Sequence, residues 1–102
     1  RQMCIRDRAT LVPYETMQLC LDSLKVVQMG VGHTNTSAAS DLGVAALNLK
    51  SAVQGAWLNV LINLAGIKDE AFVAEYKQKG QEILAQALPL ADEIYNTILT
   101  SL

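Results

Sequence analysis

The clearest pattern along the chain lies in its last third, where apolar or small residues recur at intervals of three, four or seven. A row with this spacing follows one side of an α-helix that packs along its neighbours. The row starts after Asp69, whose short side chain suits an N-cap, and predicts a helix over roughly 70–100. The residues of the row are Phe72, Tyr76, Gly80, Ile83, Ala87, Ala91, Ile94 and Ile98.

The segment from about 38 to 64 predicts a second helix with two unlike faces, each residue being turned by about 100° from the one before. One face is apolar and is expected in the core, the other is small or polar, and Gly66 is expected to end the helix in a left-handed conformation. The apolar face consists of Leu42, Ala46, Leu49, Val53, Trp57, Val60 and Leu64, and the small or polar face of Asp41, Ala45, Asn48, Ala52, Gly55, Asn59 and Asn63.

The first helix is predicted over roughly 13–29, with Pro13 at its start and Gly30 just past its end. Glycines and short polar side chains from residue 30 to 41 favour a loop between the first two helices. No segment alternates between apolar and polar residues for long enough to predict a strand. The predicted fold class is therefore all-α: three long antiparallel helices that form part of a larger helical-bundle domain.

The segment "RQMCIRDR" at residues 1–8 has no periodicity that leads into the first helix. It resembles the translated adapter sequence found at the ends of incomplete reading frames. We therefore expect residues 1–10 to be an artefactual or non-native N-terminal segment, and residues 11–102 to carry the domain.

Composition narrows the function classes. Hydrophobic residues make up 51% of 102 residues, more than so short a chain is expected to bury, which predicts self-association. Eight basic against ten acidic residues, without a basic cluster, argue against nucleic acid. Two cysteines and one histidine are too few for a zinc site and indicate a reducing, cytoplasmic setting. Lys50, in the middle of the second helix, argues against a membrane span.

Three pieces of the chain resemble a known family in order and spacing: "VPYET", "NTSAASDLGVAAL" and "GAWLNVLINLAGIKDEAF". They are similar to the C-terminal half of the formiminotransferase-cyclodeaminase and methenyltetrahydrofolate cyclohydrolase family, and the likeness covers about residues 11–100. Trp57 takes the place where the family often carries another aromatic residue. The family domain is about twice as long, and its glycine-rich N-terminal segment has no counterpart here.

The resemblance implies a folate one-carbon enzyme that works as a homodimer or higher homo-oligomer. Such an enzyme either forms methenyl-tetrahydrofolate from formimino-tetrahydrofolate with loss of ammonia, or hydrolyses methenyl-tetrahydrofolate. Neither reaction needs a metal or another cofactor beyond the tetrahydrofolate substrate. The chain alone is expected to be inactive, and an upstream formiminotransferase domain is left open. The alternative is a non-catalytic helical oligomerisation module.

Asp41 is the candidate catalytic residue, because an ionised carboxylate can face a cationic one-carbon centre or accept a proton. It is expected in the first turn of the second helix, where the helix dipole favours negative charge. Asn35 and Ser40 are candidates for binding the substrate. The alternative is structural: Ser40 or Asp41 is only an N-cap, and Asn35 only closes the loop.

Asn59 and Asn63 have two interpretations. Either they form hydrogen bonds with a neighbouring helix across a groove of small residues, or they share a ligand site with Asp41. On one straight helix about 27 Å separates Asp41 from Asn59, so a shared site requires a symmetry-related copy. His33, in the glycine-containing loop, lies outside the clearest motifs and is expected to be solvated.

Overall fold

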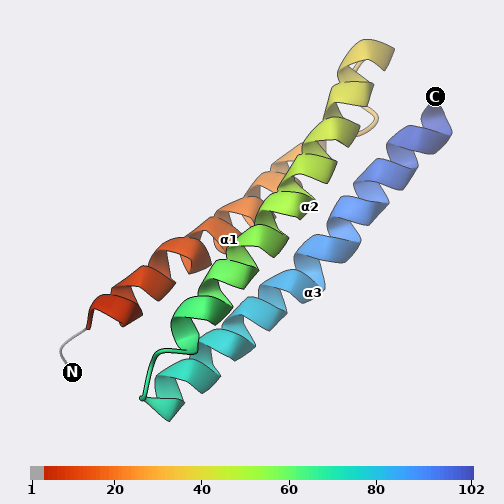
Figure 1. Ribbon diagram of the computed structural model, residues 1–102. Coiled ribbons are helices and arrows are strands. Elements are labelled where there is room, and N and C mark those ends of the chain that lie inside the picture. The colour runs from red at the N-terminus through yellow and green to blue at the C-terminus, as the bar shows by residue number, and fades with distance from the viewer. Residues whose placement is uncertain (1–3) are drawn as a thin grey trace.

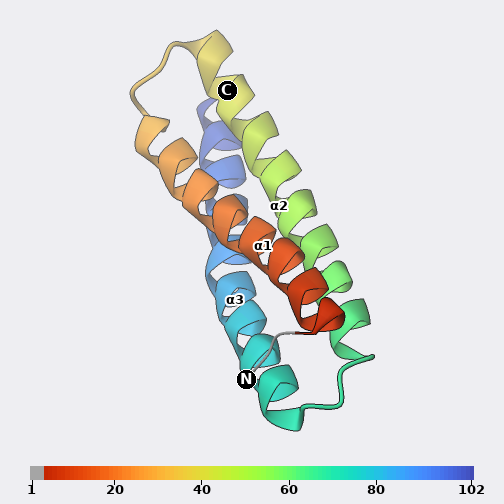
Figure 2. The same ribbon diagram turned by 90° about the vertical axis from the view of Figure 1, so that its left-hand side faces the viewer.

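The computed structural model describes residues 4–102, which form three long helices joined by two short loops (Figure 1). These are α1 (Ile5–Gly30), α2 (Thr36–Leu64) and α3 (Glu70–Ser101). Consecutive helices run in opposite directions, and each helix packs against the other two (Figure 2). The predicted all-α class with three antiparallel helices is confirmed, and residues 4–102 contain no strand.

The three helices make a rod rather than a sphere. Its principal extents are 51 × 18 × 18 Å, and its radius of gyration is 16.0 Å, against about 13 Å for a compact domain of 100 residues. In a rod of three helices, each helix turns one side inward and leaves the other exposed. The molecule therefore has a long, thin core and extensive outer faces.

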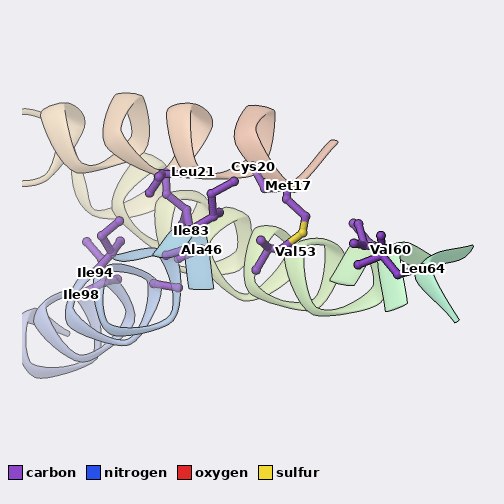
Figure 3. Packing of buried hydrophobic residues seen from close by; sticks show 14 of the residues in the cluster. Met17, Cys20, Leu21, Ala46, Val53, Val60, Leu64, Ile83, Ile94 and Ile98 are labelled. Atoms are coloured by element: carbon purple, nitrogen blue, oxygen red, sulfur yellow. The ribbon is translucent and has the colours of Figure 1, made fainter. Parts of the chain in front are cut away.

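The core follows the two rows predicted for α2 and α3. Seven of the eight residues of the α3 row are buried, six of them hydrophobic and the seventh Gly80, with Ile94 and Ala91 each 2% exposed. Val53 and Val60 of α2 are completely buried, and Met17 of α1 reaches toward Val53 (Figure 3). The buried α3 residues are Phe72, Gly80, Ile83, Ala87, Ala91, Ile94 and Ile98.

Trp57 of α2 packs directly onto Gly80 of α3. A Cβ atom at position 80 would lie only 2.1 Å from Cζ3 of the indole, so only glycine leaves space for this ring. Because Gly80 has no side chain, the indole of Trp57 packs against the backbone of α3, and this contact joins α2 to α3. Glycine in the α3 row is thus required by packing, which outweighs its low helix propensity.

The start of α1 was predicted wrongly. The helix begins at Ile5, about eight residues before the predicted start, with Cys4 as N-cap accepting from the backbone N–H of Asp7 at 3.4 Å. Pro13 therefore lies inside the helix instead of at its first turn. Proline has no N–H, so the carbonyl of Ala9 lacks its usual helical donor. The side-chain amide of Asn63 on α2 donates to that carbonyl at 3.4 Å.

The expected left-handed conformation of Gly66 is also wrong. Among the described residues only Gly32, in the loop between α1 and α2, has a positive φ, at 82°. Gly66 is required for a different reason: a Cβ atom there would lie 2.5 Å from Cζ of the Arg6 guanidinium. The first turn of α1 thus packs over the α2–α3 loop, and Asp69 caps α3 as predicted, its Oδ1 accepting from Phe72 at 3.1 Å.

Candidate functional site

The N-terminal end of α2 carries all three candidate site residues, and Asn35 is the one that starts the helix. Its Oδ1 accepts a hydrogen bond from the backbone N–H of Ala38 at 2.9 Å, which makes Asn35 the N-cap. The helix begins at Thr36, two residues earlier than predicted. The structural interpretation of Asn35 is therefore correct for its side-chain oxygen, while its NH₂ group makes no side-chain hydrogen bond within residues 4–102.

Ser40 and Asp41 are not caps, and the expectation that Asp41 lies in the first turn is wrong. The first turn contains no acidic residue, because the earlier start at Thr36 moves Asp41 into the second turn. The Ser40 hydroxyl donates to the carbonyl of Ser37 at 2.9 Å. Asp41 is exposed, and within residues 4–102 no side-chain hydrogen bond or salt bridge holds its carboxylate. The carboxylate of Asp41 therefore does not stabilise the fold through any side-chain contact within the described residues.

Two shallow hollows lie at this end of the rod, and the three candidate residues do not share either. One hollow of about 260 Å³ opens between the α1–α2 loop and the end of α3, with Thr34 and Thr36 on its wall beside Asn35. The other, of about 160 Å³, is largely apolar and has Ser40 at its edge. Asp41 lines neither hollow. Residues 4–102 thus place the three side chains within two turns of one another without enclosing a common pocket.

The two asparagines at the other end of α2 behave differently from each other. Asn63 donates to Ala9 of α1 at 3.4 Å and to the carbonyl of Asn59 at 2.9 Å. The predicted hydrogen bond to a neighbouring helix is therefore confirmed for Asn63. Asn59 is exposed and lines an open groove of about 490 Å³ between α1 and α2, and no side-chain bond of Asn59 is found within the described residues.

The aromatic residues are used for packing. Tyr14 of α1 meets Tyr76 of α3 edge-on, with ring centroids 5.1 Å apart, and Phe72 lies 4.6 Å from Tyr76 on its other side. Lys79 stands 4.9 Å from the centre of the Tyr76 ring. The hydrogen bond to Glu75 is the main reason that the pKa of Lys79 is raised. With Trp57 packed on Gly80 and Tyr76 between Tyr14 and Phe72, these rings join neighbouring helices.

The remaining ionisable or metal-binding side chains do not form a second candidate site within residues 4–102. Lys50 forms a salt bridge with Asp92 of α3 at 2.7 Å while remaining 34% exposed. Burial raises the pKa of the Cys20 thiol, which disfavours the reactive thiolate. His33 is exposed in the α1–α2 loop. In the part of the chain from residue 4 onward, no three His, Cys, Asp or Glu side chains gather closely enough to hold a metal ion.

None of the helices formed by the described residues combines the length and apolar character of a membrane-spanning segment. The family model described as formiminotransferase-cyclodeaminase matches residues 4–82, which include α1, α2 and the first part of α3. The chain belongs to this family.

Curated relatives agree with the family match. The chain is 32% identical over 90 residues to a methenyltetrahydrofolate cyclohydrolase of Methylorubrum extorquens, covering 88% of this chain and 43% of that protein. It is 45% identical over 53 residues to the formimidoyltransferase-cyclodeaminase of Sus scrofa, covering 52% and 10% respectively. The corresponding protein of Gallus gallus is 43% identical over 61 residues, covering 60% and 11%. The chain thus spans less than half the length of these relatives.

The family match also includes part of the N-terminal segment. It begins at residue 4, inside the segment 1–10 that was predicted to be non-native, and it includes the α1 turn that contacts Gly66. Residues 1–3 lie outside the described part of the chain. The sequence analysis did not identify Asn35 as the N-cap of α2. The signal was the residue type, because asparagine is among the residues preferred at that position.

Proposed function

We propose that this chain is part of a folate one-carbon enzyme. Its reaction either forms methenyl-tetrahydrofolate from formimino-tetrahydrofolate with loss of ammonia, or hydrolyses methenyl-tetrahydrofolate. The observation that carries the proposal is the match over 88% of the chain to a methenyltetrahydrofolate cyclohydrolase, together with the family match over residues 4–82. The substrate is a tetrahydrofolate derivative, and no metal or other cofactor takes part.

Asp41 has the central chemical role in this proposal. Both reactions pass through a carbon that shares positive charge with its two nitrogen neighbours, and both require a proton to be moved. A carboxylate beside that carbon stabilises the charge and can accept the proton. The exposed position of Asp41, free of any side-chain bond within residues 4–102, supports this role because nothing in the fold competes for its oxygens.

Asn35 and Ser40 bind the substrate in this proposal. The amide NH₂ of Asn35 remains able to donate, because the cap uses only Oδ1. The Ser40 hydroxyl donates to Ser37 and retains lone pairs that can accept. Since the hollows near these residues are shallow and separate, the remaining walls of the site come from the part of the family domain that this chain does not span.

The enzyme acts as a homodimer or higher homo-oligomer in the cytoplasm. The exposed apolar side chains along α1 and α2 support association, because their contact with water is unfavourable in a free monomer. Nucleic acid and membranes are not partners.

The test is an assay of two proteins: the chain alone, and the chain joined to the rest of its family domain. Formimino-tetrahydrofolate and methenyl-tetrahydrofolate are supplied separately, and the absorbance of the methenyl bridge is followed. We expect turnover of one substrate by the joined protein and none by the chain alone. The substrate that reacts identifies the reaction. A well-folded joined protein that turns over neither would refute the proposal.

The second candidate is a non-catalytic helical oligomerisation module. The row of exposed apolar residues on α1 favours it, because such a row suits helix pairing and has no evident part in catalysis. In the same assay this module would form a stable assembly without turnover of either folate.

A further inference from the structure

We draw no further inference here: the strongest candidate, the open groove between α1 and α2 that Gly55 and Asn59 help to line, carries no proposal because nothing in the structure shows what covers it.

Discussion

The two ends of α2 use similar polar side chains in opposite ways. At the C-terminal end, Leu64 is buried and Asn63 donates to the Ala9 carbonyl of α1. At the N-terminal end, the side chains of Asn35 and Ser40 bond only to the backbone of their own segment, and the Asp41 carboxylate has no hydrogen bond or salt bridge within the described residues. The C-terminal end of α2 is hydrogen-bonded to a neighbouring helix, whereas the side chains at its N-terminal end keep polar atoms that bond to no other helix.

The difference teaches that polarity alone does not indicate where the chemistry lies. Asn63 has a structural task, because its amide donates to a carbonyl that lacks its helical donor. Removing this amide should lower stability. Asp41 has no comparable structural task, so removing its charge should affect only function. Substitutions at the two ends can therefore separate folding from catalysis on a single helix.

The largest effect is expected at Asp41, in the chain joined to the rest of its domain. Asp41→Asn preserves size but removes the charge, so turnover should fall by about 10² to 10⁴-fold. The melting temperature should stay within a degree or two, because Asp41 is exposed and caps nothing. Asp41→Ala should give the same pair of results. Methenyl absorbance and a thermal melt are measured together, and near-normal turnover of Asp41→Asn would exclude Asp41 as the catalytic carboxylate.

The next largest effect is expected at Leu64, which is 2% exposed at the C-terminal end of α2. Leu64→Ala should lower the free energy of unfolding by about 2 to 5 kcal/mol, through lost burial and the cavity left behind. Val44→Ala is the control near the N-terminal end, where the side chain is 56% exposed and a change below about 0.5 kcal/mol is expected. Urea unfolding followed by circular dichroism measures both. Equal losses would show that the two ends are equally packed.

A smaller effect is expected at Asn35. Asn35→Ala removes the bond to the Ala38 N–H and should cost about 1 kcal/mol, whereas Asn35→Asp should preserve stability because Asp caps about as well. The same unfolding measurement applies. If the alanine variant were as stable as the wild type, the cap would be dispensable and Asn35 would have to be explained by ligand binding alone.

The smallest effect is expected at Asn63, whose bond to Ala9 is long at 3.4 Å. Asn63→Ala should cost about 0.5 to 1 kcal/mol by leaving the Ala9 carbonyl without a donor. In a Pro13→Ala background, residue 13 regains its N–H and can serve that carbonyl, so the same change should then cost almost nothing. A double-mutant cycle measures this coupling, and strictly additive effects would rule out the link.

Much of the fold followed from regular spacing. Most of the α3 row and four of the seven residues of the predicted α2 face are buried, because a long helix in a rod buries one side over its whole length. Tyr76 and the α2 residues Leu42, Leu49 and Trp57 are only partly buried. The start of α1 was missed because Pro13 is most often found in the first turn of a helix. What allows it inside α1 is a donor from Asn63, fifty residues later, and a contact at such separation leaves no local trace in the sequence.

The site could be predicted only in part. Asn35, Ser40 and Asp41 were expected together at the start of α2, and they are found there. Their roles shifted because the helix begins two residues earlier, which gives the cap to Asn35 and moves Asp41 into the second turn. The role of Gly66 was misread for a similar reason, since the backbone conformation typical of glycine was expected and a crowded guanidinium was found. Whether Asp41 is catalytic stays a prediction.

The contact between Asn63 and the Ala9 carbonyl has an evolutionary consequence. Pro13 leaves the Ala9 carbonyl without its helical donor and Asn63 supplies another, so we expect the residues at positions 13 and 63 to be coupled. Replacement of Pro13 should make Asn63 dispensable for this contact, whereas loss of Asn63 alone should lower stability. Members of the family should therefore show correlated residues at these two positions, with the replacement of proline as the earlier event.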